Sequence, residues 1–513
     1  MIIFYHNNCI ITEIVSTETG IFLYQINQNI ATILLDFAAQ FKDEVLVWCH
    51  ESLKDNLNIT EIQNLFHHKK FLFSYGFSNY FDRRLGYIED SLYIKINKEV
   101  NYPTWQMSSH VGAVHATVLN ACKNDLKTEK NFDYFLNSFA KRAMVNGIFC
   151  YSQPKLLIHR RVSKEAQQSN LQELFKFTKQ HYRIRWVFLL FFNLMLFEKK
   201  FAVLPFLISF FYRKRKFNPE TLNQISLESN KKLIEFGTID VLIPTIARKD
   251  YLLNVFNNLA AQTYLPQNVI IIEQNPDDNS QSNLDFISNQ KWPFIVKHHF
   301  THQAGACNAR NIGLSLIESE FTFMADDDIV FENNLLEKAI QTFQNTGNEV
   351  FLVACHSKSQ TIVPQLPVQF PVFGAGHAFV KSSCIKNLKF SMGFEFGFGE
   401  DADFGMQLRN NGFDVLYISS QTILHLKAPM GGFRTKPILK WQNDTIVPKP
   451  SPTVMLYRLL YDTKEQNKNY KATLFIKNLN RNFFLNPFKY IKIFKQKWNR
   501  SVHWANVLNK QQS

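Results

Sequence analysis

The chain contains 513 residues, of which 46% are hydrophobic and 19% are charged. This length allows two or three domains, and this composition belongs to folded rather than disordered proteins. The formal net charge of +14 favours anionic partners such as nucleic acid, anionic lipid or phosphorylated substrates. Because the sequence has no zinc-finger spacing, RNA-recognition signature or ladder of basic and aromatic residues, we expect no nucleic-acid partner.

The N-terminal region, residues 1–180, has the pattern of a mixed α/β domain. Strands are expected at MIIFYH and EVLVWCH, and a helix is expected at NIATILLDFAAQFK. The first of these segments has no basic region followed by a long apolar core, so it is not a secretory signal. The seven cysteines are dispersed and form no CxxC pair, which indicates reduced thiols in a cytoplasmic protein.

Residues 181–236 form an apolar and basic linker. Two apolar blocks, Trp186–Phe197 and Phe201–Tyr212, flank the charged triplet EKK, and basic clusters lie at both outer ends. Each block is shorter than the roughly 20 residues that span a bilayer, and one continuous helix would bury the triplet at its midpoint. We therefore expect a helical hairpin in the membrane interface, with Lys and Arg at the level of the lipid head groups. A buried helical pair that links two domains is the alternative.

Between residues 237 and 445, strands and helices alternate regularly. Strand candidates TIDVLIPT, NVIIIEQN, PFIVKHHF and EFTFMADDD occur with helical stretches such as YLLNVFNNLAAQ and AGACNARNIGLSLIE. This spacing predicts a Rossmann-like, mostly parallel α/β sheet, which binds ligands at the carboxyl ends of its strands. Residues 446–513 are expected to be a basic helical tail and a second membrane-surface element, with a solvated C-terminal helix as the alternative.

Three consecutive aspartates, Asp326–Asp328, end one of these strand candidates. Like charges at this spacing repel, and a turn needs only one Asp, so we expect a positive group beside them. Aspartates at positions i and i+2 can share a divalent ion and a diphosphate, and oxygen ligands suit Mg²⁺ or Mn²⁺. The alternative is a cap for the helix that starts near Glu332.

A second acidic cluster, Glu400, Asp401 and Asp403, follows a loop rich in Gly and Phe and opens an amphipathic helix. Acids at a helix start also complement the helix dipole without any catalytic role. His425 follows the strand candidate DVLYIS. A single histidine is usually structural, but one after a strand can complete a metal site.

Six segments in order resemble glycosyltransferase family 2, whose members are inverting transferases with the GT-A fold. The segments are VLIPTIARKDYLLNVFNNLAAQTYLPQNVIIIEQN, AGACNARNIGL, FTFMADDDIV, GAGHAFV, GEDADFGMQLRNNGF and ILH, between about residues 238 and 430. The resemblance implies a GT-A catalytic domain, a nucleotide-diphosphate-sugar donor and a divalent metal, Mg²⁺ or Mn²⁺.

The resemblance also implies which residues bind the donor. Thr245 and Glu273 match the two strand-end positions that contact the nucleoside, and Arg310 matches a position that approaches the base or the diphosphate. The family usually has Asp-Asp-Gly-Ser where this chain reads EQNPDD. Asp277 or Asp278 is therefore an alternative contact for the base.

By the same resemblance, Asp328 would bind the metal directly, Asp326 would bind the ribose or the water shell of the metal, and His425 would occupy a third metal position. Asp401, which follows Glu400, matches the catalytic base. A carboxylate across the pocket from the metal can deprotonate the acceptor hydroxyl during direct displacement, and a single base suffices for inversion.

Two glycines, Gly374 and Gly376, lie just before the strand candidate HAFV. Glycine lets a backbone approach a ligand closely, so we expect this segment to contact the donor sugar. A turn at the end of the strand is the alternative.

Residues 1–180 contain a partial echo of the segment that carries Glu400 and Asp401. When Gly147 is aligned with Gly412, the two acids fall on Phe135-Leu136, so the carboxylates are missing. We interpret the region as a degenerate GT-A-like domain that holds acceptor or mediates assembly without transferring sugar. Chance similarity between two α/β domains is the alternative.

The sequence thus predicts a metal-dependent, inverting glycosyltransferase on the cytoplasmic membrane face. It would act on a glycan or lipid-linked saccharide acceptor in the synthesis of a cell-surface polysaccharide. A sugar nucleotidyltransferase is one alternative, although PTIARKD is not the Gly-rich loop that it needs. A non-catalytic glycan-binding or scaffold protein is another, against which Asp328 and Asp401 argue. Donor sugar, nucleotide base, linkage and oligomeric state leave no sequence motif.

Overall fold

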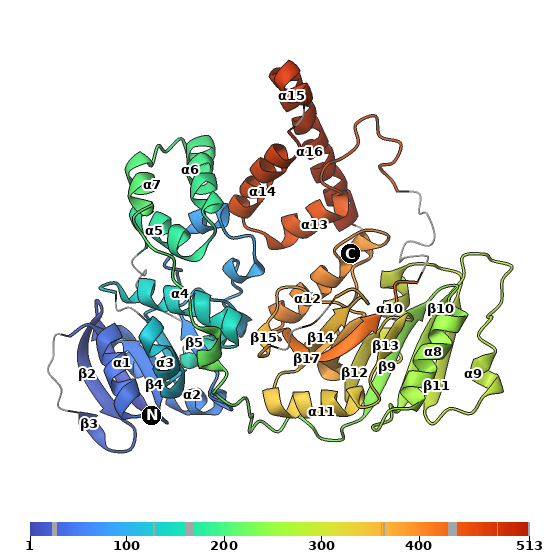
Figure 1. The fold of residues 1–513 in the computed structure, drawn as a ribbon, viewed down its shortest axis with the longest axis horizontal. Helices are drawn as coiled ribbons and strands as arrows, with labels where there is room; N and C mark the ends of the chain where they lie inside the picture. Colours follow the sequence, from blue (N-terminus) through green and yellow to red (C-terminus); the bar gives the residue numbers. More distant parts are fainter. Residues whose placement is uncertain are drawn as a thin grey trace. The chain divides into compact units, whose positions relative to one another are not determined.

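The computed structural model describes residues 1–22, 28–126, 129–159, 168–360, 362, 365–428, 439–479 and 481–510. These residues fold as two compact units, and each contains its own sheet (Figure 1). The N-terminal unit comprises Met1–Asn230 and Asp462–Ile476. The C-terminal unit comprises Lys231–Tyr461 and Lys477–Ser513. One segment of the tail therefore belongs to the N-terminal unit.

The sheet of the C-terminal unit consists of β9 (Ile239–Thr245), β10 (Asn268–Gln274), β11 (Ile295–Thr301), β12 (Phe321–Ala325), β13 (Ile329–Phe331), β14 (Val350–His356), β15 (Val368–Gln369), β16 (His377–Lys381) and β17 (Leu416–His425). Its order is β11-β10-β9-β12-β16-β14-β17-β13. Strands β9 to β12 run parallel, as the alternating pattern predicted, whereas β16 is antiparallel to both neighbours. Strand β17 is parallel to β14 and antiparallel to β13 and β15.

Helices of the C-terminal unit connect these strands: α8 (Lys249–Ala260), α9 (Phe286–Asn289), α10 (Ala306–Leu314), α11 (Leu335–Thr346) and α12 (Glu400–Asn410). Strands β9, β10 and β12 are almost fully buried along their length, as expected for the apolar runs of a sheet covered on both faces. Helix α10 packs so closely on β9 that a Cβ at Gly313 would collide with Leu242. Because β9, β10 and β12 run parallel, their carboxyl ends lie at the same edge of the sheet.

The sheet of the N-terminal unit consists of β1 (Ile2–Asn7), β2 (Ile10–Ser16), β3 (Gly20–Phe22), β4 (Val45–His50), β5 (Phe71–Tyr75), β6 (Tyr102–Pro103), β7 (Val111–His115) and β8 (Phe149–Ser152), in the order β3-β2-β1-β4-β7-β5-β8-β6. Its helices are α1 (Ile30–Gln40), α2 (Ile59–Leu65), α3 (Ala116–Cys122) and α4 (Phe132–Ala143). The strands expected at MIIFYH and EVLVWCH are β1 and β4, and the expected helix is α1.

Three helices follow this sheet: α5 (Leu171–His181), α6 (Arg185–Glu198) and α7 (Val203–Ser209). The two predicted apolar blocks form α6 and α7 as separate helices, because α6 ends at Lys199, whose backbone is left-handed (φ 53°). Large apolar side chains on this hairpin remain exposed: Phe201 is 71% exposed, Leu204 is 67% and Phe211 is 86%. Among the described helices, none has both the length and the apolar character needed to cross a membrane.

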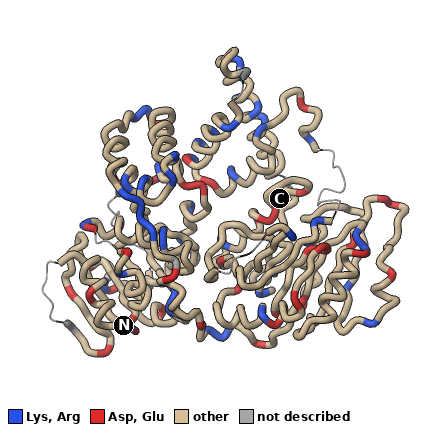
Figure 2. The backbone as a smooth tube through the Cα atoms, viewed as in Figure 1, with Lys and Arg blue, Asp and Glu red and all other residues tan. Residues whose placement is uncertain are grey.

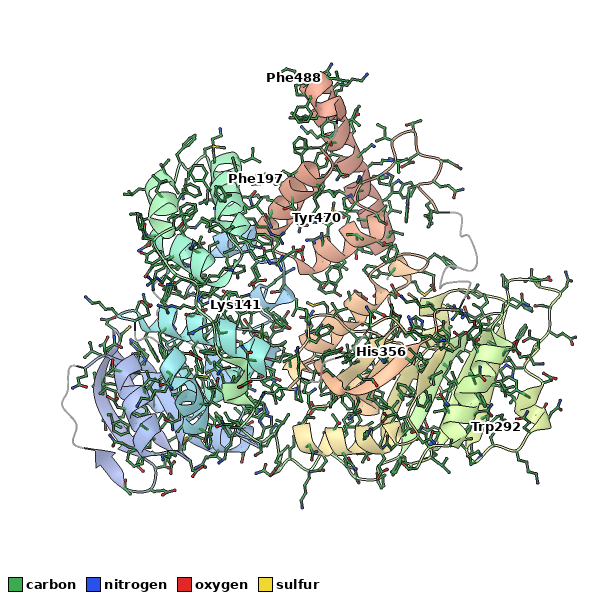
Figure 3. All side chains as sticks on the ribbon, in the orientation of Figure 1. Lys141, Phe197, Trp292, His356, Tyr470 and Phe488 are labelled. Atoms are coloured by element: carbon green, nitrogen blue, oxygen red, sulfur yellow. The ribbon has the colours of Figure 1, made fainter. Side chains whose placement is uncertain are left out.

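The tail contains α13 (Pro452–Tyr461), α14 (Lys464–Lys477), α15 (Arg481–Leu485) and α16 (Pro487–Asn509). Lys and Arg recur along it (Figure 2). Phe488, at the outer end of the α15–α16 pair, is 85% exposed (Figure 3). The tail is therefore helical, as predicted, and its outer end combines positive charge with exposed apolar surface.

Candidate active site

The candidate site lies at the carboxyl ends of three parallel strands, β9, β10 and β12. Thr245 closes β9, and it lies opposite Glu273 near the end of β10 in the parallel register. Asp326 follows β12 directly. Residues far apart in the chain are therefore brought to one edge by strand pairing, as the sequence predicted.

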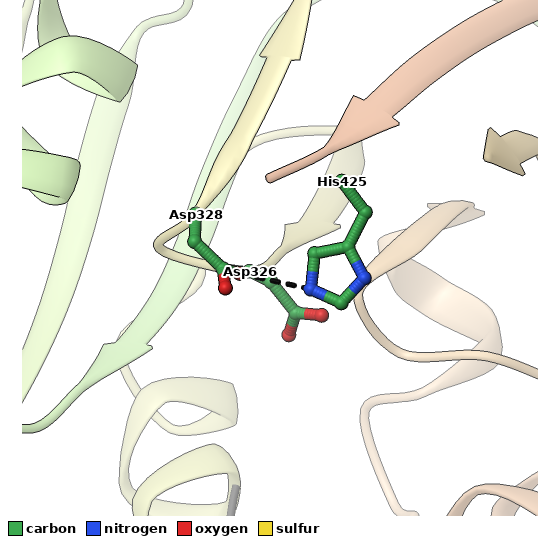
Figure 4. Close-up of side chains that lie close together, drawn as sticks. All are labelled: Asp326, Asp328 and His425. Carbon is green, nitrogen blue, oxygen red and sulfur yellow. Dashed lines mark hydrogen bonds and ion pairs between the residues drawn. The ribbon is translucent and has the colours of Figure 1, made fainter. Parts of the chain in front are cut away.

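Asp326, Asp328 and His425 form a group whose ligand atoms all lie within 4.8 Å of one another (Figure 4). The pairing of β13 with β17 explains this proximity, because it sets Ile329 opposite His425. His425 Nε2 lies 3.1 Å from Asp328 Oδ1, and the Ala428 amide donates to Asp328 Oδ2 at 3.0 Å. Two carboxylates and one imidazole fit Mg²⁺ or Mn²⁺, since oxygen ligands suit both ions and Mn²⁺ also accepts nitrogen.

The charges of this group are set by its neighbours. Burial raises the pKa of Asp328, but the hydrogen bonds from His425 and Ala428 and the nearby Arg248 bring the pKa below its ordinary value overall. The hydrogen bond to Asp328 raises the pKa of His425 against the opposing effect of burial. Asp328 is thus held ionised, which is the state that binds a cation.

The middle aspartate, Asp327, is not part of this group but lines the same cavity. Its carboxylate accepts from Thr245 Oγ1 at 2.7 Å and from Arg248 Nη1 at 2.6 Å. Arg248 also contacts Asp328 Oδ2 at 2.8 Å. Arg248 was not among the predicted site residues, because only the fold places the segment after β9 against the aspartate run. The positive group expected beside these aspartates is therefore at least partly supplied by the chain itself.

Arg310 on α10 connects the aspartates to the second acidic cluster. Its guanidinium lies 3.5 Å from Asp401, 3.7 Å from Asp326 and 4.0 Å from Glu400. Although burial lowers the pKa of Arg310, the three carboxylates raise it overall. This buried arginine consequently remains charged between the two carboxylate groups.

Glu400 and Asp401 are the first two residues of α12, behind Gly399, whose φ of 115° suits glycine. The Ala375 backbone hydrogen-bonds Asp401. Burial raises the pKa of Asp401, and Arg310 opposes this effect. Asp403, in the same acidic run, instead accepts from Tyr461, Ser391 and Gln407 and is structural.

A cavity of about 460 Å³ joins these groups. The predicted residues that line it are Thr245, Arg310, Asp326, Asp328, Glu400, Asp401 and His425. Gly376 lies behind it, where an added Cβ would collide with the Asp326 carboxylate. Within the described residues, Gly376 and Glu273 are outside the lining set, so glycine at 376 serves the position of Asp326 rather than contact with the cavity.

Glu273 is engaged elsewhere. It accepts from Ser282 Oγ at 2.5 Å and from the Asn283 amide at 3.2 Å, and it lies 2.8 Å from His298 Nε2. Gln274, the next residue, lines the cavity and accepts from the Gly305 amide at 2.6 Å. Glu273 thus fastens the loop after β10, the loop that also contains Asp277 and Asp278.

Glu395 is a further lining residue that no sequence motif indicated. Its carboxylate accepts from the amides of Cys307 and Asn308, at 3.1 and 2.8 Å, at the start of α10. A carboxylate at this helix start complements the helix dipole. The contact orients the helix that carries Arg310.

A group of side chains that could hold a metal ion and a separate half-buried carboxylate thus line one cavity, an arrangement that suits group transfer. Residues 240–398 match the family model Glycosyl transferase family 2. This part of the chain is a family 2 glycosyltransferase domain, and the C-terminal unit has the GT-A fold that the sequence predicted.

Individual proteins are also similar to the chain. Glycosyltransferase GlyG of Streptococcus pneumoniae serotype 4 is 26% identical over 114 residues, which are 22% of this chain and 38% of that protein. The match thus spans less than two-fifths of that relative. Structures of S. aureus TarS 1-349 with UDP and with UDP-GlcNAc are 16% identical, with a TM-score of 0.35. They cover 53% of this chain and 87% and 88% of their own chains.

Proposed function

We propose that the C-terminal unit transfers a sugar from a nucleotide-diphosphate-sugar donor to a saccharide hydroxyl with inversion at the anomeric carbon. One observation supports this proposal most: a single cavity contains the Asp326–Asp328–His425 group and Asp401, with Arg310 between them. This arrangement provides a place for a leaving diphosphate and a separate base. The family membership of residues 240–398 agrees with it.

In the proposed reaction, the acceptor oxygen attacks the anomeric carbon as the bond from that carbon to the diphosphate breaks. Asp401 takes the hydroxyl proton, because its half-buried carboxylate lines the cavity and is hydrogen-bonded by the Ala375 backbone. A divalent cation held by Asp328, Asp326 and His425 would neutralise charge on the diphosphate. Thr245 and Arg248 position the aspartate run through Asp327.

Calorimetric titration with UDP, GDP and dTDP, with and without Mn²⁺, tests the donor site. We expect wild type to bind one nucleotide in a metal-dependent manner. Asp328→Ala should weaken this binding by at least about 100-fold, because it removes a metal ligand and the acceptor that His425 contacts at 3.1 Å. Binding that is equally strong without metal, or in the variant, would contradict the metal site; no binding by wild type would favour the scaffold alternative.

We further propose that the protein acts peripherally on the cytoplasmic face of the membrane, on a lipid-linked or glycan acceptor of a cell-surface polysaccharide. The exposed Phe201, Leu204 and Phe211 support this proposal. Basic residues flank them on both sides, in the stretches KK before and RKRK after. An amphipathic element with this combination binds anionic lipid surfaces, and the exposed apolar side chains argue against the buried helical pair.

Sedimentation with phosphatidylglycerol-containing vesicles tests this surface. Replacing Phe201, Leu204 and Phe211 together by Asp should lower vesicle binding more than about 100-fold, since each buried large apolar side chain contributes roughly 1.5–3 kcal/mol. Phe236→Asp, at a 72% exposed phenylalanine outside the hairpin, is the matched control and should bind normally. Unchanged binding of the triple variant would place the membrane contact elsewhere or remove it.

A further inference from the structure

Six strands of each sheet share strand order, strand direction and chain order, whereas β2 is antiparallel to β1 and β10 is parallel to β9. The path β1-β4-β7-β5-β8-β6 corresponds to β9-β12-β16-β14-β17-β15. In both paths the first two strands are parallel, the third is antiparallel to its neighbours, the fourth and fifth are parallel, and the last is antiparallel. Agreement at every step makes chance similarity of two α/β domains a poor explanation.

A buried acid occupies the position of the proposed base. Asp133 is the second residue of α4, as Asp401 is of α12. Ser109, just before β7, donates its amide and its hydroxyl to Asp133, both at 2.8 Å. Ala375, just before β16, makes the corresponding contact with Asp401. Burial raises the pKa of Asp133 to about 6.

The predicted alignment of the two acids with Phe135-Leu136, and hence the loss of both carboxylates, is therefore wrong. Helix α4 has 12 residues against 11 in α12, and the three residues of the 3-10 turn η5 (Met144–Asn146) precede Gly147 where only Asn411 precedes Gly412. Both Gly147 and Gly412 are left-handed, at φ 88° and 90°, so anchoring the alignment on these glycines displaced the helix by one turn.

Within its described residues, this copy lacks the aspartate run of the other unit. β4 ends in His50 and is followed by Glu51 and Ser52 where the other unit has three aspartates. The ring of His6 packs against His50, with centroids 5.6 Å apart, and its Nε2 lies 2.8 Å from the Ser109 carbonyl. Across the described residues, no second metal-ligating group accompanies the one at Asp326.

A separate cavity of about 370 Å³ is present in the N-terminal unit. It is built by the segment after β5 and the one before β7, and its polar lining residues are Asn79, Asp82, Arg83, Gln106, Gln168 and Thr463. Gln106 is only 5% exposed; its Nε2 donates to the Ile94 carbonyl at 3.3 Å, and its amide oxygen has no partner within the described residues. A buried amide with an open acceptor facing a cavity indicates a hydroxyl or amide donor on a ligand.

The charged side chains among the described lining residues of this cavity are already paired. Arg83 is already paired with Glu465 at 2.6 Å and with Glu198 at 3.2 Å, and Asp82 is paired with Arg84. None of the described lining residues therefore offers an unpaired cation to a phosphate; Lys98, which is not a lining residue, donates to Asn79 Oδ1 at 2.9 Å. The other polar lining residues carry amide or hydroxyl groups, which can hydrogen-bond an uncharged, hydroxyl-rich molecule.

We propose that the N-terminal unit is a second GT-A domain without a donor site, and that it binds an uncharged saccharide in the cavity at Gln106. That this saccharide is a segment of the acceptor rests on the proposed function; the binding itself does not. The unit would hold a growing glycan near the membrane while the C-terminal unit transfers the next sugar.

Saturation-transfer NMR on the full chain tests the proposal, with the methyl glycosides of glucose, galactose, mannose and N-acetylglucosamine as probes. We expect transfer to at least one probe in wild type and equally in Asp328→Ala. Gln106→Leu should lower the affinity at least tenfold, and Gln168→Ala, at an exposed mouth residue that cannot disturb the core, should lower it severalfold. Both variants should keep metal-dependent nucleotide binding.

The outcomes separate this inference from the proposed function. Transfer that is absent in wild type, unchanged in both glutamine variants, or lost in Asp328→Ala would overturn the saccharide site in the N-terminal unit. Failure of the nucleotide titration with saccharide binding intact would overturn only the transferase. Should Gln106→Leu not fold, Gln168→Ala and Thr463→Val decide the question, because both side chains lie at the cavity surface.

Discussion

Replacing Asp401 by Asn should lower the turnover number by about 10²–10⁴-fold, the range lost with a general base, while donor affinity stays close to that of wild type. Asn has the same shape and can keep the hydrogen bond from the Ala375 backbone, but it cannot take a proton. Nucleotide release under saturating donor measures turnover, and calorimetry with the nucleotide measures affinity.

The matched control is Glu400→Gln, because Glu400 is the adjacent acid and also faces Arg310, at 4.0 Å. We expect its turnover to fall much less than that of Asp401→Asn. Near-normal turnover of Asp401→Asn together with a collapse in Glu400→Gln would transfer the role of base to Glu400. Equal losses in both would mean that the two carboxylates act as one unit.

The parallel part of the C-terminal unit could be predicted from the sequence because its strands are buried on both faces. Short continuous apolar runs such as VLI in β9 and VIII in β10, each followed by a helical stretch, are typical of buried parallel strands. The grouping of Asp328 with His425 was also predicted, although only from the order of motifs. The physical cause, the pairing of β13 with β17, involves a three-residue strand that no periodicity reveals.

Residues whose role depends on tertiary geometry could not be predicted. Arg248 follows β9 and Glu395 precedes α12, and they reach the site only because β9 ends and α10 begins beside it. Glu273 carries the residue type expected of a nucleoside contact, yet three nearby donors hold its carboxylate outside the cavity. Sequence indicates that an acid is present, but the neighbours decide where it points.

In the N-terminal unit the fold is similar to that of the C-terminal unit, but the sequence does not reveal how the residues correspond. Six strands of the N-terminal unit repeat a path of the other sheet, although Glu51 and Ser52 follow β4 where the other unit has three aspartates after β12. What was kept is the backbone geometry and one buried acid, Asp133, whose hydrogen bonds to Ser109 serve packing as well as they could serve chemistry. A short insertion, η5, was enough to hide this correspondence from alignment.

Replacing Arg310 by Gln should shift the acid limb of the pH–rate profile upward by about 1–3 pH units, the effect of removing an opposite charge beside a carboxylate. Burial already raises the pKa of Asp401, and Arg310 is the positive group that opposes it. The base acts only when deprotonated, so activity is lost as pH falls through this pKa. Without Arg310 the loss begins at higher pH, and turnover at neutral pH should drop.

Arg310→Lys keeps the positive charge and is the control: its acid limb should stay near that of wild type even if the shorter reach of a single ammonium weakens donor binding. The comparison distinguishes charge from geometry, since Arg310 faces Asp401 at 3.5 Å and Asp326 at 3.7 Å. An unchanged acid limb in Arg310→Gln would show that the group titrating in the profile is not Asp401. In that case the arginine would serve the donor diphosphate alone, and its loss would appear in KM rather than in the pH dependence of kcat.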